Sequence, residues 1–298
     1  MKTVSARERL SRGETVSDSI LCPAKINLFL EVTGKRENSY HEIDSVMQKV
    51  ALCDRLDVVF SKGEGIVITS NDKTVPMGEK NLVYKAISGY FAKTGISVKC
   101  EVYLEKRIPV SAGLAGGSTD AAGMLKILNR NFRAMSNAEL AEFALTLGAD
   151  VPFCLFSSQS RCRGLGEELS PAAALPHCYL LIAKHRHESV STKDAYHEID
   201  AECFTPVSAD GMLKALSGGV LSEVLPHLFN RFESIVLPKK PIASAIRNAM
   251  LQAGALGAMM SGSGPSIFGI FDDESKALAA KKAARELGAF AFVTHPWR

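Results

Sequence analysis

The sequence of 298 residues lacks the features that mark several large classes of protein. It has no run of 18 or more apolar residues, so we expect no membrane-spanning helix. Its formal net charge of +3 is too small to indicate a nucleic-acid partner. Its seven cysteines form no CxxC pair and no zinc-ligand spacing. We therefore predict reduced thiols in a cytoplasmic protein, with no metal held by protein ligands and no nucleic-acid or membrane partner.

We do not expect the N-terminal segment to be a targeting signal. Its arginines are interspersed with acidic residues, and no apolar segment follows them. A secretory signal needs such an apolar segment, and an organelle transit peptide is poor in acidic residues. We predict that residues 1–19 form a poorly ordered tail or one short added strand.

Strand and helix patterns are both present in the first half of the chain. Alternation of side chains predicts strands at 20–32, 46–60, 66–69 and 98–104. Apolar residues at helical spacing follow Asn81, a plausible N-cap, and stop before Gly95. A second helix is expected to end near residue 129. A third is expected to start at Ser136, which forms a capping-box pattern with Glu139, and to end near Gly148.

The second half shows strand patterns at 178–183, 256–260, 266–271 and 289–294. Helical patterns lie at 241–254 and 275–287. This order favours an antiparallel sheet with helices on one face, so the fold class is α+β. We predict an N-terminal tail at 1–19, an N-terminal domain at 20–168 and a C-terminal domain at 169–298.

A glycine-rich segment, PVSAGLAGGSTDA, occupies residues 109–121 between a predicted strand and a predicted helix. Gly113, Gly116 and Gly117 permit a close backbone approach, and Ser118 and Thr119 could cap the helix that follows. Backbone N–H groups at such a loop and helix start suit an anion such as phosphate. The segment is not a Walker A loop, because GxxxxGK[ST] is absent. A tight strand-to-helix turn without a ligand is the alternative.

Three segments together are more informative than the loop alone. PAKINLFL at 23–30, the glycine-rich segment and GAMMSGSG at 257–264 resemble the three motifs of the galactokinase, homoserine kinase, mevalonate kinase and phosphomevalonate kinase (GHMP) superfamily. Within it, Tyr40-His41 and LGADVPF at 147–153 are similar to the members that phosphorylate a cytidine-diphosphate-linked methylerythritol. The resemblance extends from about residue 20 to residue 271.

The resemblance implies a two-domain GHMP-kinase fold. Its N-terminal domain would resemble domain 2 of ribosomal protein S5, and its C-terminal domain would be a ferredoxin-like α/β sandwich. The active site would lie in the cleft between them. The implied activity is ATP-dependent phosphorylation of the 2-hydroxyl of the cytidylated substrate, in the non-mevalonate route to isoprenoids, with Mg²⁺ accompanying ATP. A monomer or a weak homodimer is expected.

The resemblance also implies two catalytic residues. Asp150 would accept the proton of the substrate hydroxyl, and Lys25 would lie near the transferring phosphoryl group. Phosphoryl transfer relies mainly on positioning and on positive charge around the phosphoryl oxygens, so these residue types suit the reaction. The alternatives are a helix or turn cap for Asp150 and a solvated strand residue for Lys25.

Binding residues follow from the same resemblance. Asn27 would position the substrate, Tyr40 and Tyr196 would stack on the cytosine, and His41 would hydrogen-bond to it. The alternatives are a partly buried loop aromatic for Tyr40 and a loop histidine bonded to backbone for His41. The hairpin at 261–264 would support the site near the phosphates. ATP would be bound by Pro109, Val110, Ser111, Ala112, Gly113, Leu114, Ala115, Gly116, Gly117, Ser118 and Thr119.

Departures from the superfamily pattern lie in the loop itself. Ser111, Ala112 and Ala115 stand where glycine is common, and each adds a β-carbon near the expected phosphate. We expect altered affinity for the nucleotide and retained binding. Two other functions stay open: a mevalonate or homoserine type of kinase, which would not need Tyr40-His41, and a nucleotide-binding regulator that has lost catalysis.

Overall fold

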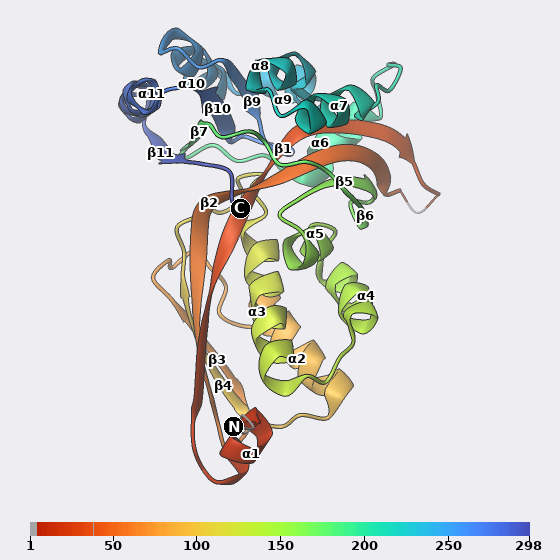
Figure 1. Ribbon diagram of the computed structural model, residues 1–298, viewed down its shortest axis with the longest axis vertical. Coiled ribbons are helices and arrows are strands. Elements are labelled where there is room, and N and C mark those ends of the chain that lie inside the picture. Colours follow the sequence, from red (N-terminus) through yellow and green to blue (C-terminus); the bar gives the residue numbers. More distant parts are fainter. Residues whose placement is uncertain (1–4, 38) are drawn as a thin grey trace. The chain divides into compact units, whose positions relative to one another are not determined.

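The structure is a computed structural model that describes residues 5–37 and 39–298 (Figure 1). Contacts divide the chain into two compact units. The first contains the residues up to 23 together with 53–110 and 116–156, and the second contains 24–52, 111–115 and 157–298. Each unit is therefore assembled from segments far apart in the sequence. The predicted boundary between residues 168 and 169 stays a prediction.

Helix α1 (Ala6–Ser11) begins the described chain, so the predicted tail or added strand is wrong for this part. The Ser5 hydroxyl oxygen accepts a hydrogen bond from the backbone N–H of Glu8, and the Glu8 carboxylate accepts one from the backbone N–H of Ser5. This is the same reciprocal cap that marked Ser136 in the sequence. Residues 1–4 lie outside the described chain.

Two long strands, β1 (Val16–Lys35) and β2 (His41–Ser61), contribute to both units and exceed the predicted strands at both ends. In the first unit β2 pairs antiparallel with β4 (Lys99–Glu105), and β4 pairs in parallel with β3 (Ile66–Ser70). In the second unit β2 pairs with β5 (Gln159–Gly164) and β1 with the short β8 (Phe229–Asn230). Strand β6 (Glu168–Pro171) pairs with β5.

Four helices complete the first unit: α2 (Leu82–Thr94), α3 (Gly116–Phe132), α4 (Asn137–Leu147) and α5 (Val151–Phe156). Helix α3 packs against the other three, and most of its apolar side chains are buried. The predicted caps are confirmed. Asn81 caps α2, which ends at a left-handed Gly95, and Ser136 forms the capping box of α4, which ends at Gly148.

The second unit contains an antiparallel sheet in the order β11-β7-β10-β9. Its strands are β7 (Tyr179–His185), β9 (Gly257–Met260), β10 (Ile267–Phe271) and β11 (Ala289–Thr294). Helices α10 (Pro241–Gln252) and α11 (Glu274–Glu286) pack on this sheet and on each other. The predicted α+β class and this antiparallel sheet are confirmed.

Shorter helices lie between β7 and α10, where the sequence patterns predicted no elements. They are α6 (Thr192–Ile199), α7 (Asp210–Gly218), α8 (Leu221–Val224), η1 (Leu225–His227), α9 (Glu233–Val236) and η2 (Leu237–Lys239). Such short helices carry little periodicity and depend on tertiary packing. None of the helices formed by residues 5–37 and 39–298 has the length and apolar character needed to cross a membrane.

Candidate active site

Lys25 and Asn27 share one face of β1, and both are buried: the exposed fractions are 4% and 1%. The alternative of a solvated Lys25 is therefore wrong. Lys25 Nζ donates to Asn27 Oδ1 at 2.8 Å, and Asn27 Nδ2 donates to Ser45 Oγ at 2.9 Å. Ser45 Oγ in turn donates to the carbonyl of Phe29 at 2.7 Å. Because each donor meets a defined acceptor, this chain of bonds fixes the Lys25 ammonium in one place.

The centre of the glycine-rich loop lies in the same unit as Lys25. The backbone N–H of Lys25 donates to the carbonyl of Leu114 at 3.1 Å. Ala112 and Leu114 bury their side chains, so these two residues can offer only backbone groups to a ligand. The loop is therefore attached directly to the strand that carries the lysine.

The backbone of this loop is left-handed at Ser111, Gly113 and Ala115, with φ of 51°, 73° and 56°. Only glycine adopts such angles without cost, so two of the three positions are strained. A β-carbon on Gly113 would lie 2.2 Å from the carbonyl oxygen of Ser261. Glycine is thus required at Gly113, where the loop packs against the second glycine segment.

That second segment is a hairpin between β9 and β10, as the sequence allowed. Ser261 Oγ donates to the Gly113 carbonyl at 3.0 Å, and Gly262 also packs against Gly113. Asn230 Nδ2 donates to the carbonyls of Met260 and Gly262 at 2.7 and 2.9 Å. The hairpin therefore supports the loop from within the second unit.

The two ends of the ATP segment lie in the first unit. Pro109 and Val110 precede the loop, and α3 begins at Gly116. Ser118 and Thr119 thus lie inside the first turn of α3, so the expectation that they cap this helix is wrong. Thr119 is buried, and its hydroxyl donates to the Pro23 carbonyl at 2.9 Å. A β-carbon on Gly117 would meet only Leu82, at 3.6 Å, which leaves space over the helix start.

A buried group of three ionisable side chains, which no local sequence pattern indicated, lies beside this helix start. Lys106 Nζ donates to Asp120 at 2.8 Å and also to Asp54. Asp54 accepts the backbone N–H groups of Arg107 and Ile108 at 2.6 and 2.8 Å. A β-carbon on Gly116 would lie 3.2 Å from Lys106 Nζ. No local pattern links Asp54 to Lys106, because they are 52 residues apart.

The close packing of these side chains shifts the pKa values of Asp120 and Lys106. Burial raises the pKa of Asp120 to about 8, the positive charge of Lys106 opposes this rise, and Asp54 adds to it. Burial acts against the charge of Lys106, but Asp120 and Asp54 outweigh it and raise the lysine pKa. One oxygen of Asp120, Oδ1, is buried without a hydrogen-bond partner. The burial of the Asp120 carboxyl is thus incompletely compensated by hydrogen bonds, and this raises its free-energy cost.

Asp150 lies in the first unit, immediately before α5, and is partly exposed. Its backbone carbonyl accepts the N–H of Cys154 at 3.0 Å, so it stands at the start of that helix. The preceding helix α4 ends at Gly148, and Val151 N–H donates to the Gly148 carbonyl at 3.0 Å. The position fits the capping alternative and is equally compatible with a catalytic carboxylate.

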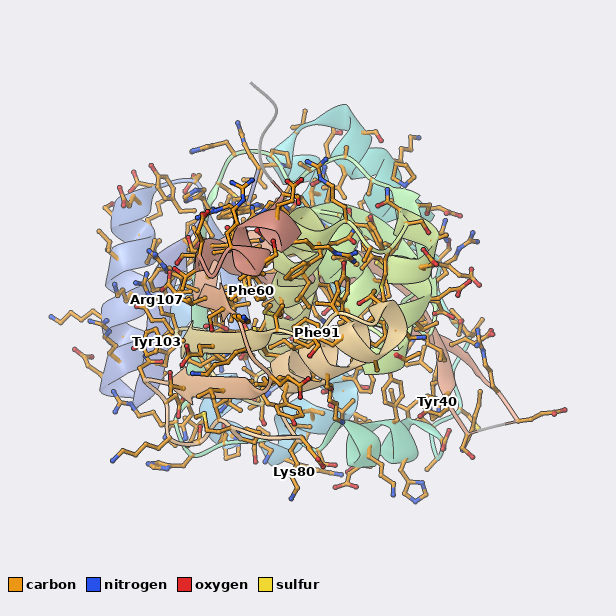
Figure 2. All side chains as sticks on the ribbon, turned by 90° about the horizontal axis from the view of Figure 1, so that it is seen from below. Tyr40, Phe60, Lys80, Phe91, Tyr103 and Arg107 are labelled. Atoms are coloured by element: carbon orange, nitrogen blue, oxygen red, sulfur yellow. The ribbon has the colours of Figure 1, made fainter. Side chains whose placement is uncertain are left out.

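The residues predicted to hold cytosine lie in the second unit. Tyr40 exposes 62% of its surface, and Figure 2 shows its side chain at the edge of the ribbon. The alternative of a partly buried Tyr40 is therefore wrong. His41 begins β2, and its Nε2 lies 2.7 Å from Asp200 Oδ1, so the alternative of a loop histidine bonded to backbone is also wrong. The ring of Tyr196, on α6, stacks on His41 with centroids 4.6 Å apart.

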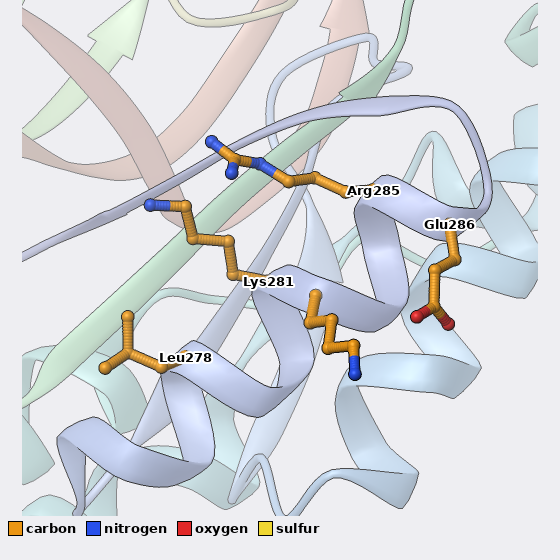
Figure 3. A pocket seen from close by; sticks show the side chains of 5 residues that line it. Leu278, Lys281, Arg285 and Glu286 are labelled. Carbon is orange, nitrogen blue, oxygen red and sulfur yellow. The ribbon is translucent and has the colours of Figure 1, made fainter.

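Two surface cavities are lined by other residues. One, of about 460 Å³, lies on α11 and is lined by Leu278, Lys281, Lys282, Arg285 and Glu286 (Figure 3). The other, of about 370 Å³, includes Arg7 and Leu10 of α1 and Phe132 of α3. Neither contains a predicted site residue.

The class of protein follows from family models that match both halves of the chain. The model of the GHMP kinases N terminal domain matches residues 81–158, which include the phosphate-loop candidate and Asp150. The model of the GHMP kinases C terminal domain matches residues 212–289. The fold is that of a GHMP kinase.

Proteins similar in sequence assign the chain to one family within this class. A 4-diphosphocytidyl-2-C-methyl-D-erythritol kinase of Lachnospira eligens is 41% identical over 267 residues, which cover 89% of this chain and 92% of the relative. The enzyme of the same name from Caldicellulosiruptor bescii is 38% identical over 90% of this chain and 93% of its own. The chain therefore belongs to the 4-diphosphocytidyl-2-C-methyl-D-erythritol kinase family.

Two solved structures have the same fold as this chain. A crystal structure of 4-(cytidine 5'-diphospho)-2C-methyl-D-erythritol kinase matches with a TM-score of 0.79 and 33% identity, covering 94% of this chain and all of that one. A mevalonate kinase of L. major matches with a TM-score of 0.73 but only 13% identity, covering 95% of this chain and 96% of that one. The second likeness concerns the fold alone.

Proposed function

We propose that this chain is an ATP-dependent kinase that phosphorylates the 2-hydroxyl of 4-diphosphocytidyl-2-C-methyl-D-erythritol, giving the 2-phosphate and ADP in the non-mevalonate route to isoprenoids. The observation that carries the proposal is the direct attachment of the phosphate-loop candidate to Lys25, through the bond from the Lys25 N–H to the Leu114 carbonyl. A buried ammonium fixed beside a glycine-rich loop suits a transferring phosphoryl group. The identity of 38–41% to enzymes of this name supports the choice of substrate.

In this reaction Lys25 supplies positive charge to the phosphoryl oxygens, and Asn27, which accepts a hydrogen bond from the ammonium, positions the substrate. The loop at 109–119 binds the phosphates of ATP through backbone N–H groups, which the first turn of α3 extends. Asp150 accepts the proton of the attacking hydroxyl. Mg²⁺ would accompany the triphosphate, since this ion is usually held by substrate phosphates with one or two carboxylates and water.

At the other end of the substrate, Tyr40 and Tyr196 stack on the cytosine and His41 hydrogen-bonds to it. Aromatic faces accept any base, so the choice of cytosine falls to hydrogen bonds. Binding of the cytosine distinguishes the proposed activity from that of a mevalonate or homoserine kinase, whose substrates carry no base. A regulator without catalysis is disfavoured because both Lys25 and Asp150 are present.

The test is a steady-state assay of the wild type and of Asp150→Ala with ATP and the cytidylated substrate. Loss of a general base should lower kcat by about 10²–10⁴-fold. Asp273→Ala is the matched control, because Asp273 caps α11 through a bond from the Ser275 N–H. If Asp150 were only a helix cap, both variants would lose stability and keep kcat.

Mass spectrometry of the product completes this test. A mass increase of one phosphate on the cytidylated substrate, absent with mevalonate or homoserine, is expected. Phosphorylation of mevalonate or homoserine alone would contradict the assignment. ATP binding without any product would favour the regulator.

We further propose that the enzyme works in the cytoplasm as a monomer or a weak homodimer. No disulfide joins any of the seven cysteines, all of which lie in the described part of the chain, and this fits a reducing compartment. Sedimentation at several protein concentrations would measure the oligomeric state.

A further inference from the structure

One carboxylate joins the facing ends of β1 and β2. Asp200, at the C-terminal end of α6, accepts hydrogen bonds on both of its oxygens. Lys35, the last residue of β1, donates from Nζ to Oδ2 at 2.6 Å, and Nε2 of His41, the first residue of β2, lies 2.7 Å from Oδ1. The carboxylate is 159 residues from His41 in the sequence, so only the fold brings them together.

The contact between Asp200 and His41 determines which ring nitrogen of His41 carries the hydrogen. The hydrogen bonds from His41 first, and then from Lys35, lower the pKa of Asp200, so this carboxyl is ionised at neutral pH. An ionised carboxylate only accepts hydrogen bonds, and therefore Nε2 of His41 carries the hydrogen. Nδ1 is the ring nitrogen left for a ligand.

Packing holds the same ring in place. The side chain of His41 is only 8% exposed, although it lies at the beginning of a strand. Tyr196 stacks on it at an interplanar angle of 19°, and Phe232 packs edge-on against Tyr196 with centroids 4.9 Å apart. Asp200 and Tyr196 both belong to the α6 segment, and Asp200 N–H donates to the Tyr196 carbonyl at 3.2 Å. One short helix thus supplies both contacts to the imidazole.

We propose that Asp200 is a positioning residue for the cytidine end of the substrate: by holding His41 Nε2–H, it directs Nδ1 to the base and sets the affinity for the cytidylated substrate. This rests on the proposed function, in which His41 bonds to cytosine. Asp200 itself does not touch the substrate. Its action passes through His41, and this distinguishes it from Tyr40 and Tyr196.

The first experiment compares Asp200→Asn with the wild type. The asparagine amide can accept a hydrogen bond from His41 or donate one to it, so the imidazole is no longer fixed in one tautomer. We expect KM for the cytidylated substrate to rise about tenfold, with KM for ATP within about twofold of wild type. Asp200→Glu should recover part of the loss. A purely structural role would lower the active fraction and change neither KM.

Glu198→Gln is the matched control, because Glu198 lies on the same helix and forms an ion pair with Lys239 on the surface. It should leave both KM values unchanged. The decisive variant is Asp200→Asn combined with His41→Ala. If Asp200 acts through His41, the double variant should have the same KM as His41→Ala alone. Additive increases, or an unchanged KM in Asp200→Asn, would overturn the inference.

Calorimetric binding of cytidine 5'-diphosphate separates this inference from the proposed reaction. If the wild type binds the diphosphate, and Asp200→Asn weakens this binding about tenfold while no turnover is seen, the reaction is wrong and the inference stands. If the wild type neither binds the diphosphate nor turns over the substrate, both are wrong.

Discussion

At the scale of single residues, polar groups that the sequence could only place on strands or in loops are buried and paired. Lys25 is fixed by Asn27 and Ser45, and Lys106 lies between Asp54 and Asp120. Isolated buried charges are costly, and each of these lysines therefore needs a defined acceptor. The Lys106 group lies next to Gly116, at the start of the helix that should face the phosphates.

Asp120 makes the stability of the protein depend on pH. Its folded pKa of about 8 exceeds the ordinary value of 3.8, so the folded state binds this proton more tightly than the unfolded state. The contribution of Asp120 to stability is therefore fully present below pH 3.8 and is lost as the pH rises from there through about 8. Asp120→Asn imitates the protonated form at every pH. Its free energy of unfolding, relative to wild type, should increase from about pH 5 to about pH 9.

Urea titrations at a series of pH values measure this difference. Lys106, Asp54 and Cys22 interact electrostatically with Asp120 and are present in both proteins, so the comparison removes much of their effect. A constant difference between the two proteins would mean that Asp120 is ionised throughout the range.

At the scale of elements, the glycine-rich loop is defined by its backbone more than by its side chains. The sequence identified the segment and the three positions where alanine or serine replaces glycine. The structure adds that Ser111 and Ala115 adopt left-handed angles, whereas Ala112 does not. A left-handed alanine costs about 1–2 kcal/mol relative to its ordinary conformation, so this loop stores strain at the expected phosphate site.

Two substitutions in this loop should have opposite effects on stability. Ala115→Gly relieves the left-handed strain and should stabilise the protein by up to about 1 kcal/mol, after the greater freedom of glycine in the unfolded chain is counted. Gly113→Ala places a β-carbon 2.2 Å from the Ser261 carbonyl and should destabilise it by about 2 kcal/mol or more. Thermal unfolding measures both. Equal effects of the two changes would show that the loop relaxes freely.

At the scale of the whole molecule, the exposure of the seven cysteines shows how completely the chain buries its apolar and reactive groups. Cys22, Cys100, Cys154, Cys162 and Cys178 are buried, Cys53 is partly exposed and Cys203 is exposed. Burial raises the pKa of Cys100 and of Cys178 to about 12, which suppresses their reactive thiolates.

A thiol reagent that absorbs on reaction should therefore modify Cys203 rapidly and Cys53 more slowly in the native protein. The other five cysteines should react only after unfolding. Cys203→Ser should remove the rapid phase and leave the rest unchanged. Rapid reaction of the five buried thiols in the native protein would contradict the packing described above.

The sequence was enough to predict the α+β class, the capped helices after Asn81 and Ser136, and the family motifs around Lys25, the glycine loop and Asp150. These features are local: caps, alternation and motifs each extend over a few adjacent residues. The sequence patterns did not predict α1, although Ser5 and Glu8 form its capping box, nor the short helices between β7 and α10.

Which distant polar groups meet could be seen only in the folded chain. Asp54 reaches Lys106, and Asp200 reaches His41, across 52 and 159 residues. No periodicity encodes such pairs, because they form when long strands and short helices pack and must satisfy their buried charges. The residues that we propose to bind or react thus come from motifs, whereas the residues that contact them and hold them in position required the fold.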